Sequence, residues 1–84
     1  MEQFETGMMA RSKSGHDAGK VYVITKVEEA YVYLVDGKVR KLDKPKKKKK
    51  KHVQLIKESF DIQGTTDVDI KRWIKIWNKE DNQN

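Results

Sequence analysis

The sequence contains no cysteine, a single proline and no long hydrophobic run. The lack of cysteine excludes disulfides, thiolate zinc sites and cysteine nucleophiles, and it agrees with a reducing compartment. No segment approaches the roughly 18 apolar residues that a membrane span needs. The first 20 residues also lack the apolar stretch of a signal peptide. We therefore expect a soluble, cytoplasmic protein with no membrane partner.

Residues arranged for catalysis are also scarce. No serine stands beside a histidine in a known motif, and no paired carboxylates lie in an apolar context. The two histidines, His16 and His52, with scattered acids do not make a convincing metal site. The loop Gly15-x-x-x-Gly19-Lys20 has the wrong spacing for a nucleotide-binding P-loop, and valine follows its lysine. We expect no enzyme, no cofactor and no metal.

Positive charge, in contrast, is concentrated in one segment. Residues 38–52 hold ten Lys or Arg and one acid, a charge of +9, whereas the whole chain carries +6. Six consecutive lysines, Lys46 to Lys51, cannot all be buried, because each ammonium loses too much solvation. Either the segment is a solvated loop that keeps the protein soluble, or it faces a dense negative array such as a phosphate backbone.

The length of 84 residues allows one small domain. Short stretches rich in β-branched and aromatic residues predict strands at 8–12, 21–27, 31–35, 39–42 and 52–56. Such closely spaced strands favour a mostly β fold, a small barrel that leaves few free strand edges. We expect this barrel to span residues 1–56 and to include a basic loop at 44–51.

Two local patterns refine this prediction. In the second strand, alternation places Val21, Val23 and Val27 on one face and Tyr22 and Ile24 on the other. Asp36-Gly37 predicts a two-residue hairpin with a type I′ turn, which pairs the strand before it with 39–42. Pro45 cannot donate a ladder hydrogen bond and should end that strand.

The C-terminal part, residues 57–84, predicts a linker followed by an α-helix over about 67–79. Thr66 and Asp69 have the spacing of a capping box. The apolar residues that follow share one helical face, at Ile70, Trp73, Ile74 and Trp77. We expect the tryptophans to clamp the helix onto the barrel; an exposed face would instead be a protein-docking site.

The segments GMMARSKSGHDAGKVYVITKV and YVYLVDGKVRKLDKPKKKKKKHVQ resemble the KOW family, in particular KOW-type ribosomal proteins of the archaeal and eukaryotic large subunit and short bacterial KOW-domain RNA-binding relatives. The resemblance covers residues 7–56. It rests on Arg11-Ser12-Lys13, Gly15, Gly19-Lys20, Asp36-Gly37, Arg40, Leu42, Pro45-Lys46 and Lys51-His52. Met8-Met9 depart from the family's valine-rich start, and the C-terminal helix lies outside the shared region.

The resemblance implies an SH3-like barrel that binds structured RNA, ribosomal RNA first, without catalysis. The residues expected to contact RNA are basic, or lie in the glycine-bearing loop, where exposed backbone N–H groups suit phosphate. They are Arg11, Lys13, Ser14, Gly15, His16, Gly19, Lys20, Lys38, Arg40, Lys41, Lys44, Lys46, Lys47, Lys48, Lys49, Lys50, Lys51 and His52. We expect the two segments to form one positive face on a monomeric, translation-associated protein, with the lysine arm ordered on binding.

Several alternatives stay open at this stage. Arg40 could contact RNA or form a surface salt bridge with Asp36 or Asp43. Tyr22, Tyr31 and Tyr33 could stack on bases, although packing on the barrel is the more economical interpretation. At the level of function, the rivals are a protein-docking module of the transcription or translation machinery, a polybasic binder of anionic membrane surfaces and a DNA-binding protein.

Overall fold

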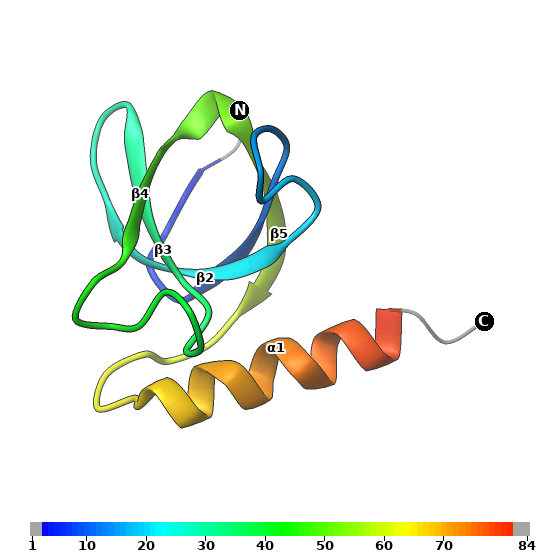
Figure 1. Cartoon of the computed structure of the whole chain (residues 1–84). Helices are drawn as coiled ribbons and strands as arrows, with labels where there is room; N and C mark the ends of the chain where they lie inside the picture. Colours follow the sequence, from blue (N-terminus) through cyan, green and yellow to red (C-terminus); the bar gives the residue numbers. More distant parts are fainter. Residues whose placement is uncertain (1–2, 82–84) are drawn as a thin grey trace.

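The computed structural model describes residues 3–81. Five strands, one short 3₁₀ helix and one α-helix follow each other along the chain (Figure 1). They are β1 (Met8–Ser12), β2 (Val21–Val27), β3 (Tyr31–Val35), β4 (Lys46–Lys49), η1 (Lys50–His52), β5 (Val53–Ser59) and α1 (Asp67–Asp81).

The strands form one curled antiparallel sheet in the order β4-β3-β2-β1-β5. The first and last strands of the chain are therefore neighbours, which bends the sheet into the open ring of Figure 1. The predicted mostly β fold, a small SH3-like barrel with a C-terminal helix, is confirmed. Strands β1, β2 and β3 have the predicted bounds, whereas β5 continues beyond the predicted end at residue 56 as far as Ser59.

A bulge in β2 changes the predicted alternation of side chains. Ile24 pairs with Leu34 and Lys26 pairs with Tyr33, so Thr25 is the extra residue between two consecutive partners. An extra residue shifts everything after it to the opposite face. Val27 consequently packs with the cluster inside the barrel and not with Val21 and Val23, so that part of the prediction was wrong.

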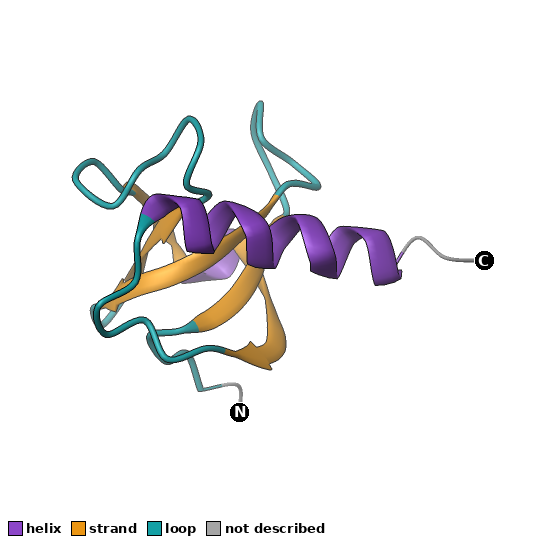
Figure 2. Cartoon of the chain, turned by 90° about the horizontal axis from the view of Figure 1, so that it is seen from below, coloured by secondary structure: helices purple, strands orange, loops and turns teal. Residues whose placement is uncertain are grey.

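The sheet has an apolar cluster on each side. The barrel interior holds Ala10, Tyr22, Ile24, Val32, Leu34 and Val53. The other face packs against α1 through Met9, Val21, Val23, Val35, Ile70 and Ile74. Figure 2 shows the helix lying across the strands. Removal of apolar surface from water on both faces is the main stabilising contribution in a chain of this size.

The helix begins and packs as predicted. The Thr66 hydroxyl accepts a hydrogen bond from the Asp69 amide, and the Asp69 carboxylate accepts one from the Thr66 amide, which is the reciprocal capping box. Phe60 stacks on Trp73 with ring centroids 4.5 Å apart. Trp73 and Trp77 are half-buried against the helix-side cluster, so the prediction that they clamp the helix on the barrel is confirmed. Residues 82–84, at the end of the predicted C-terminal region and beyond the predicted helix, lie outside the described part of the chain.

The predicted hairpin at Asp36-Gly37 was wrong. No non-glycine residue described has positive φ, so Asp36 cannot occupy a type I′ turn. Its Oδ1 instead accepts hydrogen bonds from the amides of Lys38, Val39 and Arg40, at 2.9, 3.0 and 2.8 Å. Because these amides donate to a side chain within the turn, they do not pair with a neighbouring strand, and residues 39–42 form no strand.

This turn is instead fastened to the start of α1. Gly37 has φ +76°, and a Cβ placed there would lie 2.2 Å from the carbonyl oxygen of Asp67. The Leu42 amide donates to Asp67 Oδ1 at 2.7 Å. Residues 36–45 thus form a loop that lies against the helix, and the strand that pairs with β3 comes only after Pro45.

The predicted basic loop at 44–51 was also wrong over most of its length. Lys46–Lys49 form β4, which pairs with β3 from Tyr31↔Lys49 to Leu34↔Lys46. Lys50–His52 form η1, in which the Lys50 amide donates to the Ala30 carbonyl at 2.9 Å. Pairing with the apolar and aromatic strand β3 gives these lysines an ordered, extended backbone. The structure therefore does not support the prediction of a lysine arm that becomes ordered only on binding.

Candidate nucleic-acid interface

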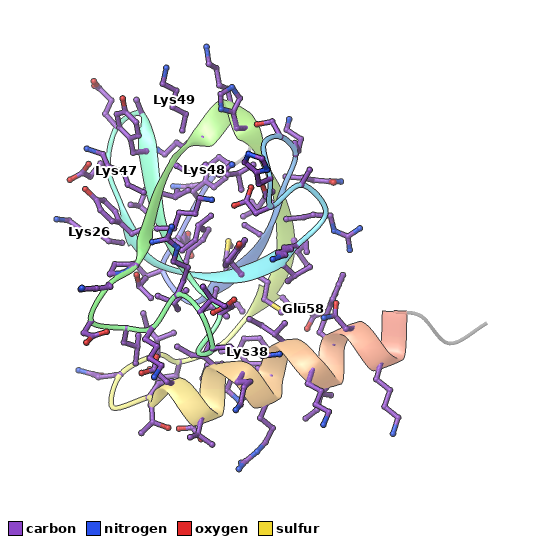
Figure 3. The ribbon with its side chains drawn as sticks, in the orientation of Figure 1. Lys26, Lys38, Lys47, Lys48, Lys49 and Glu58 are labelled. Carbon is purple, nitrogen blue, oxygen red and sulfur yellow. The ribbon has the colours of Figure 1, made fainter. Side chains whose placement is uncertain are left out.

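The lysine strand alternates between two environments because successive side chains of a strand point to opposite faces. Lys46 and Lys48 turn inward, with side chains 27% and 11% exposed. Lys47 and Lys49 are exposed on the outside. Figure 3 shows Lys48 on the inner side of the ring of strands and Lys47 and Lys49 on its outer side. The four lysines of β4 therefore form two separate pairs, one on each face of the strand.

The inward pair meets a carboxylate that sequence reasoning missed. Asp17, in the loop after β1, is buried with a side chain only 7% exposed. Its Oδ2 lies 2.6 Å from Lys46 Nζ, and its Oδ1 lies 3.1 Å from Lys48 Nζ. Ser12, the last residue of β1, donates a hydrogen bond from its hydroxyl to Asp17 Oδ1 at 2.8 Å. We call Asp17, Lys46 and Lys48 the inner ion cluster.

Two pKa values reflect this cluster. Burial by itself raises the pKa of Asp17, but hydrogen bonds from Lys46, Ser12 and Lys48 outweigh it and hold that pKa well below its ordinary value. Burial, reinforced by the nearby Asp17 charge, raises the pKa of Tyr22 to about 12. At neutral pH, Asp17 is therefore ionised and pairs with both inward lysines, while Tyr22 is neutral.

The outward pair lies beside tyrosines of β3. Lys47 Nζ is 4.4 Å from the ring centroid of Tyr31 and 6.0 Å from that of Tyr33. Lys26 Nζ approaches the Tyr33 ring at 5.2 Å from the β2 side. These contacts hold cations over half-exposed aromatic faces. We call the surface formed by Lys26, Tyr31, Tyr33, Lys47 and Lys49 the outer platform. Tyr22, in contrast, is buried in the barrel, as the packing interpretation predicted.

The glycine-bearing loop, residues 13–20, is closed by its own backbone. Gly15 and Gly19 have φ +85° and +89°, as their predicted role requires. The Gly19 amide donates to the Ser12 carbonyl at 2.8 Å, and the Lys13 amide donates to His52 at 2.9 Å. Those N–H groups are therefore not available to a phosphate. This loop can therefore contact a partner through its side chains but not through the Gly19 amide.

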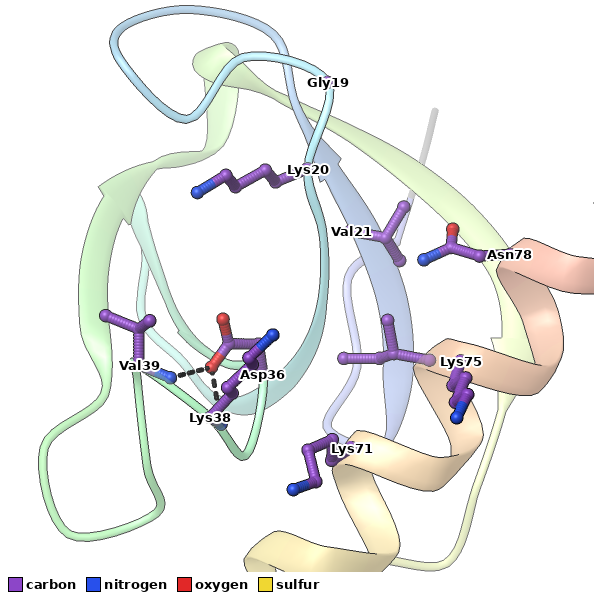
Figure 4. A pocket seen from close by; sticks show the side chains of 10 residues that line it. Gly19, Lys20, Val21, Asp36, Lys38, Val39, Lys71, Lys75 and Asn78 are labelled. Atoms are coloured by element: carbon purple, nitrogen blue, oxygen red, sulfur yellow. Dashed lines mark hydrogen bonds between the residues drawn. The ribbon is translucent and has the colours of Figure 1, made fainter.

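An open groove of about 860 Å³ lies between α1, the glycine-bearing loop at 13–20 and the loop at 36–45 (Figure 4). Its lining includes four lysines and one acid, Asp36. Asp36 already accepts three backbone hydrogen bonds. The lysines come from three parts of the chain, namely Lys20, Lys38, Lys71 and Lys75. We call this the basic groove. It unites Gly19, Lys20 and Lys38, which the sequence predicted to share one positive face.

The remaining predicted residues are spread around the barrel. Arg11 lies over the Trp77 ring at 5.3 Å and faces the helix. The Ser14 carbonyl accepts a hydrogen bond from Lys48 Nζ at 3.0 Å. Lys50 Nζ lies 5.6 Å from the Phe4 ring, and His52 is half-buried. The exposed members are Lys13, Gly15, His16, Arg40, Lys41, Lys44 and Lys51. The predicted single face is thus divided into a groove, a platform and the inner ion cluster.

Sequence reasoning missed Asp17 and the helical lysines. Lys71, Lys75 and Asn78 stand at i, i+4 and i+7, which places them along one side of the helix beside its apolar face. That spacing was readable from the sequence. Asp17 gave only a weak signal, because a single acid in a basic loop looks like an ordinary surface residue.

No protein-family model matches the chain, and a search of curated proteins finds no match. Within the described residues, no three His, Asp or Glu side chains gather in a way that could hold a metal ion. No helix in residues 3–81 has the length and apolar character to cross a membrane.

Proposed function

We propose that this chain is a non-catalytic RNA-binding protein, with structured ribosomal RNA as its first candidate partner. The observation that carries the proposal is the ordered placement of the lysine run. Lys47 and Lys49 are presented on a paired strand, next to the half-exposed rings of Tyr31 and Tyr33. Cations held beside aromatic faces are typical of surfaces that bind phosphates and unstacked bases.

The fixed backbone favours binding over a purely solubilising role. A disordered lysine arm loses conformational entropy when it binds, whereas a strand that is already formed loses less. A solubilising loop also needs no internal counterion. Here Asp17 forms an ion pair with each of the two lysines that face inward, and the outward charges are left for a partner. Shape and phosphate position, more than base identity, would guide recognition of a folded RNA.

The resemblance to KOW-type ribosomal proteins adds the ribosome as the specific setting, in the cytoplasm and in translation. The chain's match to that pattern at Gly15, Gly19-Lys20 and Asp36-Gly37 supports this assignment at the level of sequence. Protein docking through the helix has less support, because Trp73 stacks on Phe60 and Trp77 lies under Arg11.

Sedimentation of the protein in a lysate gradient at low and high salt tests the proposal. Co-migration with the large ribosomal subunit that is lost at high salt is the expected result, because phosphate contacts weaken as counterions compete. Migration as free protein in both conditions contradicts the ribosomal role. Competition between ribosomal RNA and duplex DNA for the purified protein then separates RNA binding from a general affinity for polyanions.

A further inference from the structure

The basic groove has features that the proposed function does not yet use. Lys20, Lys38, Lys71 and Lys75 line it, and within the described part of the chain no ion pair engages any of them. Four unpaired cations around one groove repel each other, which destabilises the free protein slightly. A ligand that carries several negative charges removes this repulsion on binding.

The fold itself brings these lysines together. Gly37 approaches the helix so closely that a Cβ there would lie 2.9 Å from the Lys71 amide nitrogen, and Lys38 is the next residue. Lys20, the last residue of the glycine-bearing loop, also lines the groove (Figure 4). The groove thus exists only because the loop after β3 lies on α1.

The open shape of the groove favours a chain of phosphates over a single anion as its ligand. It is open, and Lys71 and Lys75 are one helical turn apart, about 6 Å along the axis. Cations in a row suit successive phosphates of a strand, whereas an enclosed site with converging donors suits one phosphate. Val21 and Ile74 provide an apolar floor between the charged walls.

We propose that an RNA phosphate backbone lies in the basic groove, so that α1 is part of the RNA-binding surface and not only a support for the barrel. This inference rests on the RNA-binding function proposed above. Lys71 and Lys75 contact phosphates from the helix side, and Lys20 and Lys38 contact them from the two loops. Asn78 adds a neutral side chain able to donate a hydrogen bond at one end of the groove.

The test compares two double variants of the helix in the full chain. Lys71→Gln with Lys75→Gln removes two charges from the groove. Arg72→Gln with Lys79→Gln removes two charges from exposed helix positions that do not line it. Each protein is titrated with a large-subunit ribosomal RNA fragment over a range of salt concentrations. Circular dichroism and urea unfolding establish that each variant is folded.

The groove variant is expected to reduce the steepness of log K against log salt by about 1.4 to 1.8, since each phosphate contact contributes about 0.7 to 0.9. The control variant should keep the wild-type slope, and Lys71→Arg with Lys75→Arg should restore it. Equal losses in both glutamine variants, or no loss in either, overturn the inference while RNA binding stands. Absence of RNA binding by the wild-type protein overturns both proposals.

Discussion

Lys48 Nζ lies 3.1 Å from Asp17 Oδ1, although 31 positions separate the two residues in the chain. The contact joins β4 to the loop after β1. It also allows four consecutive lysines to form a strand, because one buried carboxylate pairs with both of the side chains that face inward.

Replacement of Asp17 by asparagine should destabilise the fold by about 2–4 kcal/mol, since Lys46 and Lys48 then keep their charge without a counterion. The expected loss is below that of a fully buried pair, because the Lys46 side chain is 27% exposed. Urea denaturation measures it. Asp43→Asn, at an exposed acid, makes the same change in net charge and should leave stability nearly unaltered. Equal stability of the two variants contradicts the role of the cluster.

The same cluster predicts an acid limit to stability. The pKa of Asp17 is lowered by folding, so its contribution is fully present above the unfolded-chain pKa near 3.8 and is lost as the pH falls below it. Urea midpoints of the wild type should therefore fall more steeply below about pH 4 than those of Asp17→Asn. Parallel pH profiles of the two proteins would show that Asp17 is not held ionised by the fold.

Substitution of Gly37 should destabilise the fold far more than substitution of Gly64, a glycine with the same φ. Gly37 and Gly64 both have φ +76°, but only at Gly37 would a Cβ meet another part of the chain, the Asp67 carbonyl at 2.2 Å. Gly64→Ala is expected to cost about 1 kcal/mol from strain alone. Gly37→Ala should cost at least about 1–2 kcal/mol more, because the loop must leave the helix. Thermal or urea unfolding of the pair gives the difference, and similar losses would refute the close packing of loop on helix.

The sequence predicted the strands that are rich in β-branched and aromatic residues, and it failed at the strand that is not. VYVITKV and YVYLV have this composition, and their bounds are confirmed. β4 is all lysine, with neither alternation nor high β-propensity, and it becomes a strand only through pairing with β3 and through Asp17. Both causes lie far away in the chain.

The error at residues 39–42 has a local cause. Val39 and Leu42 suggested a strand, but the Asp36 carboxylate accepts hydrogen bonds from three successive amides, of which the last two belong to the predicted strand. The candidate site shows the same limit. Basic residues could be identified by type, yet their division into a groove, a platform and the inner ion cluster depends on tertiary contacts such as Gly37 on α1.

The alternation along β4 predicts that neighbouring lysines have different roles. Lys47→Gln with Lys49→Gln should weaken RNA binding and leave stability within about 0.5 kcal/mol of the wild type, since both side chains are exposed. Lys46→Gln with Lys48→Gln leaves Asp17 buried without its cations and should cost about 3–5 kcal/mol. Binding titrations and urea unfolding of both variants check this. If the two double variants lose the same RNA affinity and the same stability, inward and outward lysines of β4 do not have different roles, and this prediction is wrong.

The most direct measurement is the affinity of the purified protein for a large-subunit ribosomal RNA fragment as a function of salt. If about six phosphates are neutralised, log K should fall against log salt with a slope of about −4 to −5. Such a slope, made shallower by Lys47→Gln with Lys49→Gln, is the result that the account predicts. Absence of binding at low salt, or an affinity that does not change with salt, would contradict it.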